Sequence, residues 1–139
     1  MVDQNCAYCM EGELVAKFGI KICELETSKV YLFKEQSHPG RCIVAHKKHV
    51  GDMNELTAEE RAAYFEDVAR VARAIMKAFN PDKVNYGAYG DTGHHLHFHL
   101  CPKYKDEFEW GGVFLMNPDK KYLSDEEYAD MIAKIKANL

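Results

Sequence analysis

Residues 85–104 constrain the fold of this chain more than any other stretch. They hold four of the seven histidines, and three of these lie two positions apart, at His95, His97 and His99. Successive side chains of a β-strand point to opposite faces, so in a strand the three imidazoles would share one face. The other face would be apolar, formed by Leu96, Phe98 and Leu100. We therefore predict a strand that buries its apolar face in a core and leaves its imidazole face open to a ligand.

A row of imidazoles suits chemistry at cellular pH. Imidazole titrates near neutrality, so it can act as a nucleophile, a general base or a metal ligand. Three on one face provide a nucleophile with neighbours that orient it or hold a charged group. A purely metal-binding site and a chance pattern are the alternatives.

Further strands are predicted from alternating apolar and polar residues, at 20–26, 30–34, 41–46 and 84–89. Together with the helices below they indicate an α+β fold with an antiparallel sheet of about five strands.

Two helices are predicted from capping boxes. Thr57 and Glu60 begin a long helix, which the pair 80–81 ends, and Ser124 begins a short C-terminal helix. We expect the apolar stripe of the long helix to lie in the core; it comprises Phe65, Val68, Ala69, Ala72, Ile75, Met76 and Phe79. The segment 105–123 is predicted to be irregular, with Phe108 and Trp110 covering a pocket or a dimer partner.

Length and composition limit the classes of protein. The 139 residues show no repeat, low-complexity segment or linker, so we predict a single domain over residues 1–139. A net charge of −4 argues against a broad nucleic-acid-binding surface, although a small anion needs only local positive groups. No apolar run is long enough to span a bilayer, and no signal-peptide pattern is present. Five cysteines without a secretion signal predict a reducing, cytoplasmic location.

Cys6 and Cys9 form a CxxC pair, which in such a location is half of a metal site or a redox pair. Redox pairs usually lie at a strand-to-helix junction of a βαβ unit, and no such unit follows. Zinc needs four ligands from cysteine and histidine. The two cysteines therefore require partners elsewhere in the chain.

The stretch His95–Cys101 fits the pattern H-φ-H-φ-H-φ-φ, in which φ is apolar, at every position. It resembles the signature of the histidine-triad (HIT) superfamily of nucleotide hydrolases and transferases, and the resemblance extends from about Cys6 to Tyr104. The transferase branch has glutamine at the third histidine, so His99 is similar to the hydrolase branch. The resemblance implies a HIT-like fold with one long helix and a short C-terminal helix.

A zinc site is also implied. Bacterial HIT proteins with an N-terminal CxxC bind zinc through both cysteines, a histidine after a Lys-x-His turn and the first triad histidine. By resemblance the ligands here are Cys6, Cys9, His49 and His95. A zinc with four protein ligands has no open position for substrate, so we expect a structural role. His95 is then no candidate nucleophile.

Catalytic roles follow from the same resemblance. The middle triad histidine is the nucleophile, so His97 is expected to attack the α-phosphorus of a nucleotide, and water then releases the nucleoside monophosphate. His99 and the backbone near Thr92 would hold the phosphate oxygens. No catalytic metal is required. His94 would face away from the triad and receives no role.

The nucleotide-binding residues are expected before the triad, where family members carry Asn and then Gly-Gln-Ser. The matching residues are Asn85, Gly90, Asp91 and Thr92. Asp91 departs from the usual glutamine, which can change the preferred leaving group. Arg41 stands where relatives often have histidine. Glu35 lies about where the family places an acid against the ribose hydroxyls.

The predicted function is a nucleotide hydrolase or nucleotidyl transferase that cleaves at the α-phosphate of a purine nucleotide conjugate or a dinucleoside polyphosphate. Relatives are commonly homodimers, and we expect the same here, with no nucleic-acid or membrane partner. Three alternatives remain: a nucleotide- and zinc-binding regulatory module, a hydrolase whose triad holds a catalytic metal, and a thiol redox protein using Cys6 and Cys9.

Overall fold

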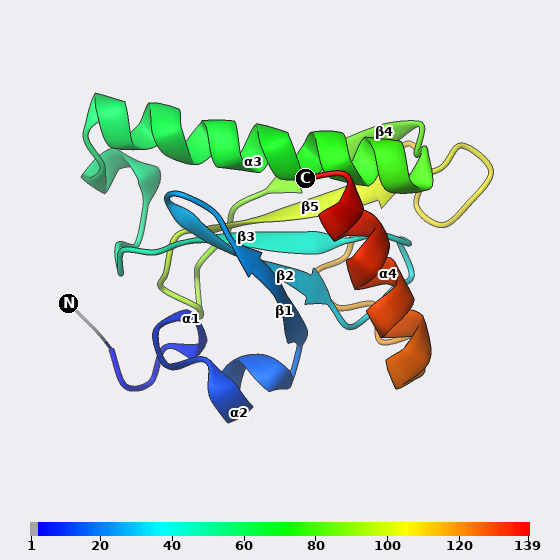
Figure 1. Ribbon diagram of the computed structural model, residues 1–139, viewed down its shortest axis with the longest axis horizontal. Coiled ribbons are helices and arrows are strands. Elements are labelled where there is room, and N and C mark those ends of the chain that lie inside the picture. The colour runs from blue at the N-terminus through cyan, green and yellow to red at the C-terminus, as the bar shows by residue number, and fades with distance from the viewer. Residues whose placement is uncertain (1–2) are drawn as a thin grey trace.

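A five-stranded antiparallel sheet forms the centre of the computed structural model, which describes residues 3–139 (Figure 1). The strands are β1 Gly19–Glu24, β2 Ser28–Phe33, β3 Cys42–His46, β4 Lys83–Gly87 and β5 His97–Lys103. Their order in the sheet is β1-β2-β3-β5-β4. The predicted α+β fold with an antiparallel sheet of about five strands is confirmed.

The helices are α1 Ala7–Met10, α2 Gly12–Ala16, α3 Ala58–Phe79 and α4 Asp125–Ala137, with a 3₁₀ turn at Met53–Glu55. Both predicted capping boxes are present: Thr57 and Ser124 each accept a hydrogen bond from the backbone three residues later. Asn80 ends α3 in the left-handed conformation, with φ of 50°. None of the helices within residues 3–139 is long and apolar enough to cross a membrane.

Helix α3 buries a stripe that is rotated from the predicted one. Val68, Ala72 and Ile75 lie in the core as expected, but Phe65 and Met76 are 38% and 41% exposed. Tyr64 and Val71 are buried in their place. The rotation has a polar cause, because the Tyr64 hydroxyl donates a hydrogen bond to the Val44 carbonyl at 2.7 Å and so turns toward β3.

The two faces of the sheet are covered differently (Figure 1). Helices α3 and α4 cover one face and bury the larger apolar cluster, to which Leu96, Phe98 and Leu100 contribute. The short helices α1 and α2 lie over part of the other face, against a smaller cluster. The imidazoles of His97 and His99 alternate with the apolar residues of β5 and therefore point to this less covered face.

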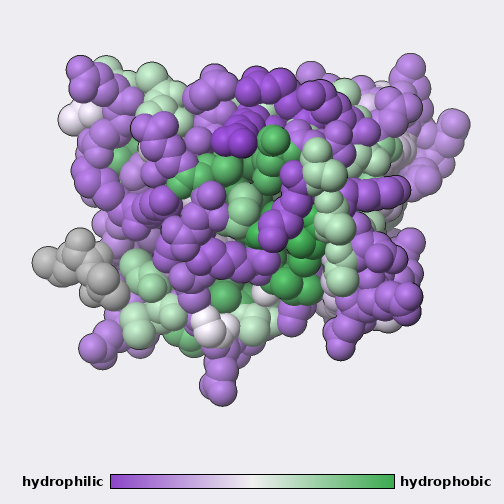
Figure 2. All heavy atoms as spheres, viewed as in Figure 1, coloured by the Kyte–Doolittle hydropathy of each residue, from purple (hydrophilic) through white to green (hydrophobic). Residues whose placement is uncertain are grey.

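The outer side of the α3–α4 face is mixed in character. Figure 2 shows that hydrophilic residues cover α3, whereas hydrophobic residues gather near the middle of this view, where β1 and α4 lie. The side chains of these two elements that are partly buried against the larger cluster are Ile20, Cys23, Met131 and Ile132.

Asp67 on α3 ties the helix to the β1–β2 turn. Its buried carboxylate accepts hydrogen bonds from the Thr27 backbone N–H at 2.9 Å, the Thr27 hydroxyl at 2.7 Å and the Ser28 hydroxyl at 2.8 Å. A buried carboxylate needs such donors, since it loses its water on folding. The three bonds therefore set where the hairpin meets α3.

Candidate active site

The three triad imidazoles lie in one row, although His95 is not in the strand. The ring of Tyr8 is 5.4 Å from that of His95 and 4.9 Å from that of His97, and the His97 and His99 rings are 5.3 Å apart. The prediction of a shared face is confirmed. The prediction that His95 belongs to the strand is wrong, because its N–H bonds to the Gly93 carbonyl at 2.7 Å in a tight turn.

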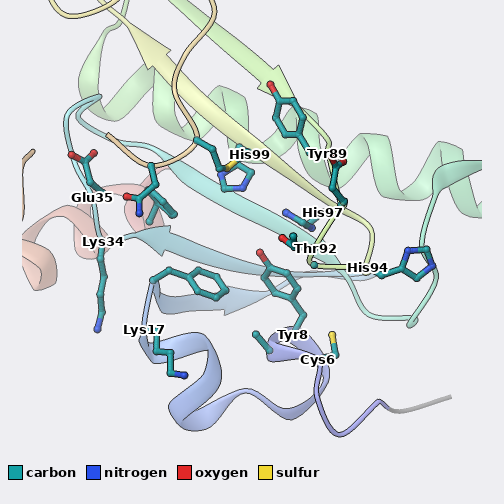
Figure 3. A pocket seen from close by; sticks show the side chains of 18 of the residues that line it. Cys6, Tyr8, Lys17, Lys34, Glu35, Tyr89, Thr92, His94, His97 and His99 are labelled. Carbon is teal, nitrogen blue, oxygen red and sulfur yellow. The ribbon is translucent and has the colours of Figure 1, made fainter. Parts of the chain in front are cut away.

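A cavity of about 930 Å³ opens over the His97 and His99 part of this row (Figure 3). His97 and His99 project into it from β5, Tyr8 reaches it from α1, and Thr92 belongs to the turn at its edge. The turn, residues 90–93, begins with Gly90 at φ of 95°, a conformation that favours glycine. Aromatic rings and the segment 113–117 complete the walls.

The two ring nitrogens of His97 have different surroundings. Nδ1 lies 2.6 Å from the His95 carbonyl oxygen. A carbonyl only accepts, so Nδ1 carries the proton and donates, and Nε2 of the neutral ring keeps a lone pair. Burial lowers the pKa of His97, which favours this neutral form. The geometry thus gives His97 the state that a nucleophile requires.

His99 has the opposite arrangement. The guanidinium Nη2 of Arg41 donates to Nδ1 of His99 at 3.1 Å, and a guanidinium cannot accept. The proton of the neutral ring is therefore on Nε2. Burial, and then the charge of Arg41, lowers the pKa of His99 to about 2, so the ring is neutral near pH 7. His99 can donate a hydrogen bond into the cavity, and it cannot act as a base there.

Cys6, Cys9, His49 and His95 bring their ligand atoms within 4.8 Å of one another. The single turn of α1 places Cys9 beside Cys6. Nδ1 of His95 is 3.4 Å from the Cys6 sulfur and 3.1 Å from Nδ1 of His49, and the Cys9 sulfur is 3.3 Å from Nδ1 of His49. Bonds of 2.0–2.3 Å to a tetrahedral zinc imply ligand separations of about 3.3–3.8 Å, which these approach.

The outer contacts also suit a metal. Nε2 of His95 lies 2.6 Å from the His46 carbonyl, so it carries the proton and leaves Nδ1 free to bind a cation. Nε2 of His49 faces the Asp3 carboxylate at 3.9 Å. Such partners commonly orient the histidine ligands of a metal. The four residues predicted from the sequence are thus one group that could hold a metal ion.

Comparison with known proteins identifies the family. The family model described as "HIT domain" matches residues 19–106. This chain belongs to the HIT family. Adenosine 5′-monophosphoramidase of Schizosaccharomyces pombe is 27% identical to this HIT protein over 116 residues, which cover 77% of this chain and 80% of the relative.

Solved structures agree with the fold. A histidine triad protein from Sinorhizobium meliloti superimposes with a TM-score of 0.84 at 25% identity, covering 92% of this chain and 95% of that one. A zinc-bound HIT family protein from Mycobacterium smegmatis has a TM-score of 0.66 at 22% identity, covering 95% of this chain and 94% of that one.

The structure brings some of the predicted nucleotide-binding residues of this HIT protein to the cavity. Gly90, Asp91 and Thr92 line it, but Asn85 does not. Asn85 is half-buried on β4 opposite Cys101. His94, which we expected to face away from the triad, also lines the cavity and is exposed.

Glu35 lies at the far end of the cavity, but its carboxylate is already occupied (Figure 3). It accepts hydrogen bonds from both the N–H and the hydroxyl of Ser37, and from the backbone N–H groups of Lys120 and Lys121. Burial opposes its ionisation, yet these bonds hold the pKa of Glu35 below its usual value. Its contact with a ribose remains a prediction, and its visible role is to hold the 120–121 backbone to the end of β2.

Several cavity residues were missed because they carry no local motif. Tyr8, Phe33 and Phe114 line the cavity, whereas the predicted cover residues Phe108 and Trp110 do not. Phe108 instead packs on the ring of His38 at 5.2 Å. The missed residues lie far apart in the chain, so only the fold brings them together.

Proposed function

We propose that this protein hydrolyses a purine nucleotide conjugate at its α-phosphate through a nucleotidyl intermediate on His97. One observation carries the proposal: the Nδ1 proton of His97 is committed to the His95 carbonyl, so the Nε2 lone pair is available at the cavity. A neutral, oriented imidazole at a cavity of this size is what attack on a bound phosphate requires.

The reaction has two displacements at phosphorus. Nε2 of His97 forms a bond to the α-phosphorus while the bond to the leaving group breaks. Water then attacks the same phosphorus, breaks the N–P bond and releases the nucleoside monophosphate. The Nε2–H of His99 donates to a non-bridging oxygen, and the 90–93 turn offers further donors. Thr92 lies at the turn, where its hydroxyl can assist departure of the leaving group.

An adenosine or other purine nucleotide is the substrate class that we favour. The S. pombe relative is named for an adenosine phosphoramidate, and the bonds to be cleaved here are a phosphoramidate or a phosphoanhydride. The cavity of this chain offers aromatic rings at Tyr8, Phe33 and Tyr89, which suit a purine.

We further propose that Cys6, Cys9, His49 and His95 hold a zinc ion with a structural role. The thiolates and imidazoles form a set that zinc prefers, and all four positions would be filled by protein. Zinc would connect α1 to the turn before β5. One zinc per chain by elemental analysis is the expected result, and it would leave no free dithiol for redox chemistry at this pair.

The test of the function is a panel of adenosine phosphoramidates and diadenosine polyphosphates with wild type and His97→Ala. Wild type should turn over at least one of them, and rapid acid quenching should trap adenylate on His97. His97→Ala should lose at least about 10³-fold in kcat, because it removes the covalent route. A protein that binds nucleotide without turnover or adduct would be a binding module instead.

Activity that survives a chelator would separate this proposal from a hydrolase with a catalytic metal in the triad. The homodimer, the single domain over residues 1–139 and the cytoplasmic location remain predictions. Light scattering on the purified protein tests the first of these.

A further inference from the structure

Arg41 is a fully buried guanidinium that forms no direct ion pair with a carboxylate of residues 3–139. Among residues 3–139, salt bridges form at several surface lysines and arginines but not at Arg41. Its Nε makes no hydrogen bond to any described residue. Burying an unpaired cation is costly, so a compensating interaction is expected at such a site.

The surroundings of Arg41 compensate its charge only in part. The guanidinium carbon lies 4.1 Å from the centre of the Phe33 ring and 5.0 Å from that of Phe114, within the range of cation–π attraction. Nη1 donates to the Leu115 carbonyl at 3.2 Å, and Nη2 to the Met116 carbonyl at 2.8 Å. All of these direct partners are neutral, and the carboxylates of Glu35 and Glu109 act on the guanidinium only from beyond ion-pair distance, so a positive charge remains beside the cavity wall.

Arg41 also contacts the triad. Nη2 donates to Nδ1 of His99, and the ring of His99 lines the cavity. Because this bond takes the lone pair of Nδ1, the Nε2–H of His99 is a donor at all times. The fixed charge behind the ring also polarises that N–H toward an anion.

We propose that Arg41 is a positioning residue that fixes His99 as a neutral Nε2–H donor and places a permanent positive charge behind it for the bound phosphate. This inference rests on the proposed function for its chemistry but not for its geometry. His97 and His99 then present opposite groups at Nε2, a lone pair for attack and a proton for the phosphate oxygen.

The geometry is tested by ¹⁵N NMR of histidine-labelled protein at about pH 7.5, without substrate. Wild type should show His99 as one form, protonated at Nε2 and unprotonated at Nδ1. Arg41→Leu, which keeps an apolar side chain between the two phenylalanines, should lose this single form. A wild-type ring protonated at Nδ1, or an unchanged signal in Arg41→Leu, would overturn the proposal.

The chemistry is tested by a double-mutant cycle on the turnover of an adenosine phosphoramidate. Arg41→Leu should lower kcat by about 10²-fold, the usual effect of removing one preorganised donor. In a His99→Gln background the same change should cost less, about tenfold, because the glutamine amide donates without a tautomer and only the loss of the positive charge remains. Arg41→Lys should recover kcat to within about tenfold of wild type, since it restores a charged donor.

A merely structural tether gives a different pattern. If Arg41 only held the 115–116 carbonyls, Arg41→Leu would cost the same factor in both backgrounds, and that result would reject the proposal. Should Arg41→Leu fail to fold, two results still test the proposal: the protonation of His99 in wild type, seen by NMR, and the kcat of Arg41→Lys. If wild type neither turns over a substrate nor forms an adduct, the proposed function is rejected. The NMR measurement needs no substrate, so it would still test the pairing of Arg41 with His99.

Discussion

The three triad histidines are chemically identical in the sequence and differ in the protein by which ring nitrogen is occupied. Nε2 of His95 donates a hydrogen bond to a backbone carbonyl, and its Nδ1 faces the other proposed metal-binding residues. Nδ1 of His97 donates to a backbone carbonyl, whereas Nδ1 of His99 accepts from a guanidinium. The alternating pattern predicted the shared row. It could not predict these partners, because each comes from another part of the chain or from the local turn.

A pH dependence of stability follows from His99. The folded pKa of His99, about 2, lies below the usual histidine value. As the pH falls below about 6.5, this ring therefore becomes protonated in the unfolded chain while it stays neutral in the folded protein. Stability attributable to this group is therefore complete above about pH 6.5 and falls as the pH drops below it. Between about pH 7.5 and 5.5, wild type should lose about 1 kcal/mol more unfolding free energy than His99→Gln, measured by urea titration.

The exposed His94 supplies the control for this measurement. His94→Gln makes the same substitution at an exposed ring, so it shows how much of the change comes from replacing a histidine rather than from burying one. Equal losses in wild type and His99→Gln would show that His99 is not held neutral.

The elements differ in how far local sequence determines them. The capping boxes at Thr57 and Ser124 are complete local signals, and both helices begin where they predict. Helices α1 and α2 were not predicted, because they span 4 and 5 residues and are too short for a periodic pattern. The predicted apolar stripe of α3 wrongly included Phe65. Hydropathy gives the period of a helix, but the rotation of α3 about its own axis also depends on the hydrogen bond of the buried Tyr64.

The attachment of the β1–β2 hairpin to α3 depends on Asp67. Asp67→Ala should lower the free energy of unfolding by about 2–3 kcal/mol, because it leaves the buried Ser28 hydroxyl and the Thr27 donors without their acceptor. Urea unfolding measures the change. Glu66→Ala is the matched control, since its salt bridge with Arg73 is largely exposed and should contribute less than about 0.5 kcal/mol. Similar losses of unfolding free energy in both variants would argue against a stabilising role of the Asp67 hydrogen bonds.

The molecule as a whole assembles its site from segments that are distant in sequence. The alternation of apolar and polar residues predicted the sheet and the histidine row, and the family resemblance predicted the four residues of the metal group. Neither predicted the cavity walls at Tyr8, Phe33 and Phe114, because ordinary aromatic residues carry no signal until the chain has folded around them.

Metal removal tests how the whole molecule is held together, since the proposed zinc ligands Cys6, Cys9, His49 and His95 connect the N-terminal segment to the turn before β5. Stripping zinc should lower the stability by about 3 kcal/mol relative to protein in free zinc at about one hundred times its Kd. Thermal unfolding with and without a chelator measures the shift. Cys6→Ser should abolish the response to the chelator, whereas Cys23→Ser, which lies outside the group, should retain it. A chelator without effect on wild type would contradict the metal assignment.

The contacts of Arg41 also limit how this protein can diverge. Nη1 of its guanidinium donates to the Leu115 carbonyl of the cavity wall, and Nη2 donates to both the Met116 carbonyl and the ring of His99. Mutations that reshape this wall to admit a new substrate would therefore disturb the group that receives the phosphate. Selection for altered specificity should thus accumulate changes in other parts of the lining, such as Lys17 and Phe18, before it touches the segment from 113 to 117.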